Sequence, residues 1–139
     1  MPTQAELVSI VAEIAEDEVA VRAARTLLQD RGSPTAPALA HELGLPSRFA
    51  LARRLRRSRA LPFVELRAWV VVHHALQAFE SDGATPCKVL LTAGKDPAGF
   101  YRLVRRLTGR SWTDVCKLGS AWFLGRFAER CREHYAEVR

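Results

Sequence analysis

The residues best suited to chemistry in this sequence are arginines, and they are concentrated in one stretch. Residues 47–59, SRFALARRLRRSR, contain six arginines and no acidic residue. A guanidinium group pairs bidentately with the O6 and N7 atoms of guanine and also binds phosphates. The stretch therefore indicates a basic surface that faces an anionic partner.

Helical geometry separates this stretch into two sides. At 100° per residue, Leu51 and Leu55 fall on one side. The opposite side carries Phe49, Arg53, Arg56 and Arg57. We expect a helix that packs through a narrow leucine seam and exposes its arginines.

The same pattern returns 49 residues later, where Leu51–Arg57 aligns with Phe100–Arg106. The second helix is expected to bury Phe100, Val104 and Leu107. Its outward residues are expected to be Ala98, Arg102, Arg105 and Arg106. Two one-sided basic helices at a fixed interval are unlike a chance cluster of charge.

Each basic helix follows a short helix and a glycine turn. Residues 36–43 predict a short helix that Gly44 ends, and Ser47 can cap the basic helix. In the second copy, residues 86–93 precede Gly94, and Asp96-Pro97 opens the basic helix. Short helix, turn and capped basic helix are typical of a helix-turn-helix.

The remaining chain predicts further helices and no strand, so the fold class is all-α. Residues 63–81 have helical spacing and would span about 28 Å. The expected organisation is 1–34 as N-terminal helices on the first unit, 35–61 as the first helix-turn-helix, 62–82 as a long linker helix, 83–110 as the second helix-turn-helix and 111–139 as one C-terminal helix. The helix within 111–139 is expected to bury an apolar stripe that includes Leu118, Phe123, Phe127 and Tyr135.

Composition agrees with an anionic partner. The chain has 139 residues, a net charge of +6 and a pI of about 9.9. The charge is segregated, because residues 1–30 hold six acids and two arginines whereas the basic residues gather in 47–59 and 95–110. Three cysteines without short spacing predict reduced thiols, and no signal peptide or bilayer-spanning run is present, so we expect a cytoplasmic protein with no membrane partner.

Residues 35–115 resemble a known family. LAHELGLPSRFALARRLRRSRALPFVELRAWVVVHHALQAF is similar to the first helix-turn-helix and linker helix of an AraC/XylS-type DNA-binding domain, and TPCKVLLTAGKDPAGFYRLVRRLTGRSWTDV resembles the second. The resemblance implies a bacterial transcription regulator that reads two adjacent major grooves of double-stranded DNA.

The resemblance also implies which residues contact DNA. The base-facing positions are Phe49, Ala52 and Arg53 in the first unit and Ala98, Tyr101 and Arg102 in the second. Arg105 fits either a base or, like Arg56, Arg57 and Arg106 one turn further on, the phosphate backbone. Residues expected elsewhere on the DNA surface are Ser47, Arg48, Arg56, Arg57, Lys95 and Arg106. Phe49 is almost as plausible as a core aromatic as a partner for a thymine methyl group.

Other functions have weaker support. No nucleophile with a base pattern and no paired carboxylates are present, so neither an enzyme nor a cofactor is expected. Cys131 and His134 offer half a zinc site with Cys116 as a third ligand, but a second ligand pair is missing and no metal is expected. The alternative is a protein-binding adaptor or dimerisation module on a helix-turn-helix scaffold that does not read DNA. The N- or C-terminal helices are the expected contact for RNA polymerase or another partner protein.

Overall fold

The structure is a computed structural model that describes residues 4–92, 94 and 96–137. Within these residues it contains nine α-helices and no strand, which confirms the all-α prediction. The helices are α1 (Gln4–Ala15), α2 (Glu18–Gln29), α3 (Ala36–Glu42), α4 (Arg48–Arg57), α5 (Phe63–Asp82), α6 (Pro86–Thr92), α7 (Pro97–Thr108), α8 (Trp112–Leu118) and α9 (Ser120–Glu137). Over the described ranges, no helix combines the length and the apolar character that a bilayer span requires.

Short polar side chains fix where many of these helices begin. A side-chain oxygen accepts a hydrogen bond from a first-turn backbone N–H, which satisfies a donor that the helix itself leaves unpaired. The capping residues are Asp17, Thr35, Ser47, Asp96 and Ser111. Asp17 explains why α2 begins at Glu18. The spacing of Thr3 and Glu6 also predicts a capping box for the first helix, but Thr3 lies outside the described residues.

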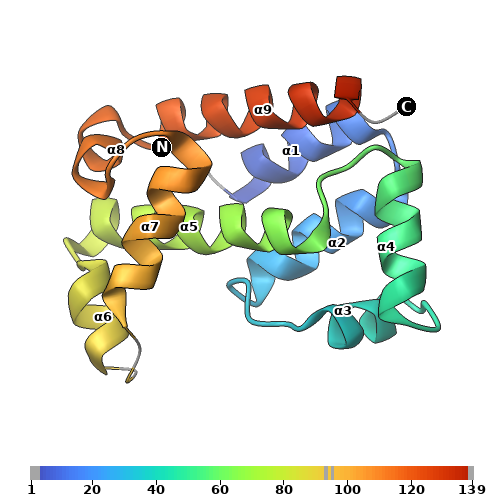
Figure 1. Cartoon of the computed structure of the whole chain (residues 1–139), viewed down its shortest axis with the longest axis horizontal. Coiled ribbons are helices and arrows are strands. Elements are labelled where there is room, and N and C mark those ends of the chain that lie inside the picture. Colours follow the sequence, from blue (N-terminus) through green and yellow to red (C-terminus); the bar gives the residue numbers. More distant parts are fainter. Residues whose placement is uncertain (1–3, 93, 95, 138–139) are drawn as a thin grey trace.

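Helix α5 lies at the centre of the arrangement (Figure 1). The α3–α4 pair stands at one end of α5 and the α6–α7 pair at the other, while α9 runs along its length and packs against α1. Helix α2 contacts both α4 and α5 and so links the first pair to the centre. The two basic helices are thus held apart by one continuous helix of 20 residues.

Aromatic contacts between α5 and α9 form the middle of the core. The Trp69 ring centroid lies 5.3 Å from that of Phe123 and 5.4 Å from that of Phe127. All three side chains are fully buried. Each tilted or edge-on aromatic pair adds about 0.5–1.5 kcal/mol to the stabilisation from burial.

The expected single C-terminal helix is wrong, because the chain forms two helices there. Gly119 has φ 92° and ψ 174°, a conformation outside the helical region, and it separates α8 from α9. Ser120 then begins α9 and donates its hydroxyl hydrogen to Glu80 near the end of α5. The break lets α9 turn back along α5, where Phe123 and Phe127 become buried.

Three residues expected to face the core are exposed. Val89 on α6 is 54% exposed, Leu118 on α8 is 46% exposed and Tyr135 on α9 is 39% exposed. Helix α6 packs mainly against α7, so helical spacing overestimated its buried stripe. Near the end of α9, the Arg59 guanidinium carbon lies 4.9 Å from the Tyr135 ring centroid and shields that ring in part.

His73 is a polar residue at the centre of the apolar core. It is fully buried, and neither ring nitrogen has a hydrogen-bond partner among the described residues. Its ring centroid lies 6.2 Å from that of Phe123. Burial, together with the nearby charge of His74, lowers the pKa of His73 from its usual 6.5 to about 4.

The His73 environment predicts an acid-sensitive fold. Between pH 6.5 and 4 the unfolded chain binds a proton that the folded chain does not, so the free energy of unfolding falls by about 3 kcal/mol. His73→Leu should remove this part of the fall while changing stability little at pH 7. Urea unfolding at a series of pH values measures the effect, with exposed His41→Leu as the matched control. Parallel pH profiles for the parent protein and His73→Leu would contradict the prediction.

A bidentate ion pair joins α9 to the start of α5. Arg130 donates from Nε to Glu65 Oε2 at 2.7 Å and from Nη2 to Oε1 at 3.0 Å. Trp69 Nε1 donates to the same carboxylate at 3.3 Å. Burial raises the pKa of Glu65, but the hydrogen bonds from Arg130 and Trp69 outweigh burial and hold it below its usual value.

Removal of Arg130 should therefore cost more than removal of a nearby exposed arginine. Arg130→Met leaves a three-quarters buried carboxylate without its guanidinium and should lower the free energy of unfolding by about 1–3 kcal/mol. Arg126→Met is the matched control on the same helix, because its partners Glu129 and Glu133 are largely exposed, and should change stability by less than about 0.5 kcal/mol. Equal urea midpoints for the two variants would exclude a structural role for the Glu65–Arg130 pair.

Candidate nucleic-acid interface

Helix α4 packs through the leucine seam that its spacing predicts. Leu51 and Leu55 are each 1% exposed and belong to the core. The Ser47 hydroxyl accepts a hydrogen bond from the Ala50 N–H at 3.2 Å, so this residue of the predicted DNA surface caps α4. The cap and the seam fix both the starting point of α4 and the side that faces outward.

The outward side of α4 is aromatic and basic. Phe49 is 62% exposed, which makes a core position for this residue wrong. The Arg48 guanidinium carbon lies 4.9 Å from the Phe49 ring centroid, an arrangement that limits the freedom of both side chains. The other outward residues are Ala52, Arg53, Arg56 and Arg57, all of which are exposed.

Arg54 differs from its neighbours because it binds another helix. Its Nε lies 3.6 Å from Asp17 Oδ2 at the N-terminus of α2. Asp17 also accepts the backbone N–H of Val19 at 2.7 Å, so one carboxylate caps α2 and holds α4. The partners are 37 positions apart in the sequence, and no local pattern marks them as a pair.

Helix α7 has the same division into a packed side and an exposed side. Phe100 and Val104 are buried, and the Phe100 ring centroid lies 5.4 Å from that of Trp112 on α8. Tyr101 is half-buried, with its ring centroid 5.8 Å from that of Phe100. Tyr101 is therefore held by the aromatic cluster and presents only part of its ring outward.

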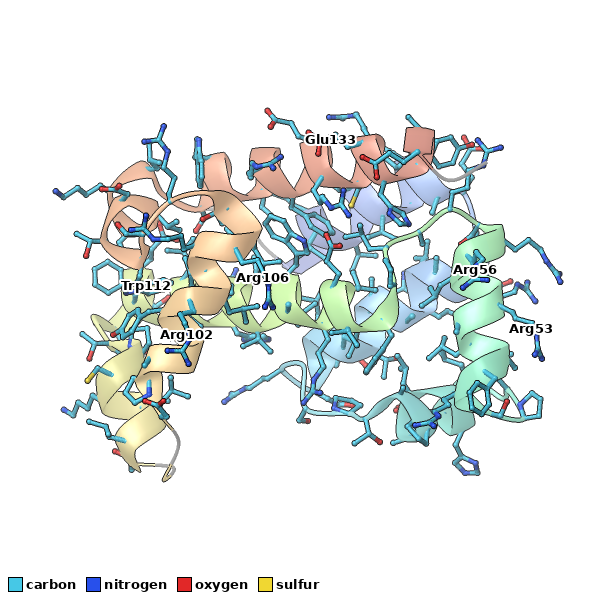
Figure 2. All side chains as sticks on the ribbon, in the orientation of Figure 1. Arg53, Arg56, Arg102, Arg106, Trp112 and Glu133 are labelled. Atoms are coloured by element: carbon cyan, nitrogen blue, oxygen red, sulfur yellow. The ribbon has the colours of Figure 1, made fainter. Side chains whose placement is uncertain are left out.

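The exposed side of α7 again consists mainly of arginine. The predicted site residues Ala98, Arg102, Arg105 and Arg106 are exposed. Figure 2 shows Arg102 and Arg106 on α7, far from Arg53 and Arg56 on α4. Lys95, also predicted to contact DNA, lies outside the described residues. The structure thus places the predicted site in two separate basic surfaces.

The outward arginines of α4 and α7 differ electrostatically from Arg126 and Arg130 of α9. In the described part of the chain, the ion pairs of arginine involve Arg54, Arg126 and Arg130. No carboxylate partner is found there for the following arginines: Arg48, Arg53, Arg56 and Arg57 on α4, and Arg102, Arg105 and Arg106 on α7. Arg126 and Arg130 on α9 are paired with carboxylates, whereas the outward arginines of α4 and α7 remain available for an anionic partner.

Arg106 has a different setting from Arg102. It lines an open groove between α5, α7 and α9, whose other charged residues are Glu65, Arg126, Arg130 and Glu133. Figure 2 shows Arg106 on the side of α7 toward the centre of the molecule. Arg106 therefore lies among charges of both signs.

Two of the three cysteines, Cys116 and Cys131, sit in surroundings that keep their thiols protonated. All three cysteines are free thiols. Burial raises the pKa of Cys131 to about 12 and that of Cys116 to about 11, so both stay protonated at neutral pH. Among the residues with described positions, no three His, Cys, Asp or Glu side chains gather to hold a metal ion.

Comparison with known proteins found no family model, no curated protein and no solved structure that matches this chain. Its function is therefore inferred from its own residues and their arrangement.

Proposed function

We propose that this chain is a sequence-specific double-stranded DNA-binding protein that regulates transcription. In this proposal α3–α4 and α6–α7 are two helix-turn-helix units, and α4 and α7 enter two adjacent major grooves. The observation that carries the proposal is the pair of arginine-rich helices at opposite ends of α5, whose outward arginines have no carboxylate partner among the described residues. The transcriptional role rests on the resemblance of residues 35–115 to AraC/XylS-type DNA-binding domains.

The spacing of the two helices supports this geometry. At about 1.5 Å per residue, the 20 residues of α5 span about 30 Å. Adjacent major grooves on one face of B-DNA lie about 34–36 Å apart. Figure 1 shows α4 and α7 at the two ends of α5 and running in the same general direction. A modest bend of the DNA toward the protein, which costs about 1–6 kcal/mol, closes the remaining difference.

The exposed side chains divide into two roles in this proposal. Arg53 and Arg102 contact base edges, where a guanidinium pairs bidentately with guanine. Arg56, Arg57 and Arg105 contact phosphates and fix the register of the protein on the duplex. Phe49 is exposed beside Arg48, where its ring can touch a thymine methyl group. The two helices differ in their outward residues, so the preferred site is asymmetric and one chain occupies it.

Salt-dependent binding to mixed-sequence duplex DNA tests the proposal. A protein that neutralises several phosphates should lose affinity steeply as salt rises. The slope of log K against log salt concentration should become more negative by about 0.9 for each phosphate contact. A triple variant of α4, Arg53→Gln with Arg56→Gln and Arg57→Gln, should flatten the slope by about two to three units. The corresponding variant of α7, at Arg102, Arg105 and Arg106, should do the same. Fluorescence anisotropy at several salt concentrations gives the slopes.

A charge-matched triple variant provides the control. Arg22→Gln, Arg25→Gln and Arg132→Gln remove the same charge from exposed positions outside α4 and α7. This variant should change the slope by less than about one unit, because those residues do not meet phosphate. If all three triple variants had equal slopes, or if the parent protein showed little affinity, a protein-binding adaptor would replace the DNA-binding proposal.

Selection of preferred sites from random DNA separates the two roles. Arg53→Ala and Arg102→Ala should each relax base preference in a different half of the site, at about 1–3 kcal/mol per lost contact. Arg57→Ala should weaken binding to all sequences and flatten the salt slope by about one unit. Footprinting should show one chain protecting two adjacent groove segments on the same face. Identical selection profiles for Arg53→Ala and Arg57→Ala would disprove the division of roles.

A further inference from the structure

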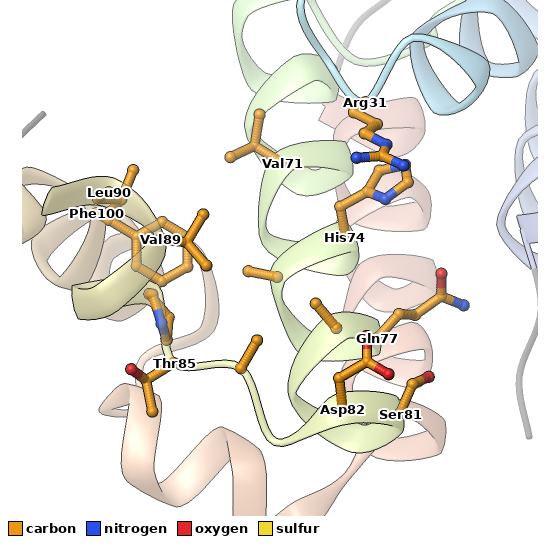
Figure 3. Close-up of a pocket in the computed structure, with 14 residues that line it drawn as sticks. Arg31, Val71, His74, Gln77, Ser81, Asp82, Thr85, Val89, Leu90 and Phe100 are labelled. Carbon is orange, nitrogen blue, oxygen red and sulfur yellow. The ribbon is translucent and has the colours of Figure 1, made fainter. Parts of the chain in front are cut away.

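A pocket lies between α5, α6 and the turn that joins α2 to α3. It has a volume of about 440 Å³, within the range of small-molecule sites. Residues from both ends of the molecule line the pocket. Arg31 comes from the α2–α3 turn, and Phe100 comes from α7. Figure 3 shows the space between the α5 ribbon on one side and α6 with Phe100 on the other.

Most of the pocket wall is apolar. Val71, Ala75 and Ala78 contribute from α5, and Val89 and Leu90 contribute from α6. Val89 is 54% exposed although its spacing on α6 predicts burial. An apolar body that entered the pocket would remove this exposed side chain from water, which is favourable by about 25 cal/mol for each Å² buried.

One end of the pocket is positively charged. Figure 3 shows the Arg31 guanidinium and the His74 ring together at this end, away from Ser81 and Asp82. Arg31 is exposed and has no carboxylate partner in the part of the chain that the structure describes. A bound anion would therefore meet a free guanidinium at the Arg31 end and a repelling carboxylate at the Asp82 end.

The turn that carries Arg31 is fixed to α5 by three contacts. Arg67 Nε donates to the Gly32 carbonyl oxygen at 2.6 Å, and His74 Nε2 donates to the Leu28 carbonyl oxygen at 2.9 Å. Gly32 packs so closely that a Cβ atom there would lie 2.7 Å from Val71 Cγ2. The backbone of Arg31 is therefore held in place before any ligand arrives, which lowers the entropic cost of binding.

We infer that this pocket binds a small amphipathic organic anion, with its carboxylate at Arg31 and its apolar body against Val89, Leu90 and Phe100. The size, the apolar wall, the single cationic end and the anchored turn all match this class of ligand. The inference goes beyond DNA recognition and does not depend on it. Binding is measured on the full chain without DNA, so failure of the DNA-binding proposal would leave the result unchanged.

The test uses three probes of nearly equal shape and different charge: 4-phenylbutanoate, 4-phenylbutan-1-ol and 4-phenylbutylamine. Titration of the ¹⁵N-labelled chain, followed by amide chemical shifts, gives both affinity and location. The acid should bind about tenfold more tightly than the alcohol or the amine, because it alone brings a negative charge and two acceptor oxygens to Arg31. Its shifts should map to the α2–α3 turn, α5 and α6.

Variants identify the residues responsible. Arg31→Gln should weaken binding of the acid about tenfold and leave the alcohol unchanged, whereas exposed Arg22→Gln on α2 should alter neither. Ala78→Phe should weaken both the acid and the alcohol by filling the pocket. The inference is overturned if the acid shows no saturable binding, if the three probes bind equally, if Arg31→Gln has no effect, or if the shifts map elsewhere.

Discussion

The packing of α5 against α9 is the contact on which the rest of the structure depends. Trp69 from α5 lies between Phe123 and Phe127 of α9, and the Glu65–Arg130 pair closes the end of the same interface. Because α5 also carries a helix pair at each end, its straightness and burial set the separation of α4 and α7. The proposed reading of two grooves by one chain requires this rigidity, since a flexible linker would lose entropy when both helices bound.

Ion pairing sorts the arginines of this chain into structural and available groups. Arg54 and Arg130 contact carboxylates on other helices, and each of these contacts fixes the position of a helix. The arginines on the outer sides of α4 and α7 have no such contacts among the described residues. The net charge of +6 is thus less informative than its distribution, because half of a basic surface can be neutralised internally without any change in composition.

The two helix pairs are similar in sequence but differ in how the core supports them. Helix α4 packs on α2 through Leu51 and Leu55 and is held by Asp17. Helix α6 contacts mainly α7 and leaves Val89 and Leu91 exposed. The pocket beside α5 lies on this second side, where α6 packs mainly against α7. The proposed ligand site therefore lies beside the α6–α7 pair, where the packing differs from that of the α3–α4 pair.

The sequence by itself determined the helices, most of their caps and the outward direction of the arginines, because these depend on interactions within about four residues of each position. Ser47, Asp96, Leu51 and Leu55 all behave as their local spacing predicts. The break at Gly119 has a local signal in the Gly119–Ser120 pair, yet the return of α9 along α5 depends on distant aromatic partners. Only the tertiary structure decided that Phe49 is exposed, that Arg130 binds Glu65 and that Arg31 reaches the pocket of α5. Those features depend on which surfaces meet after folding, and a pattern of neighbouring residues carries no information about contacts 40 or more positions away.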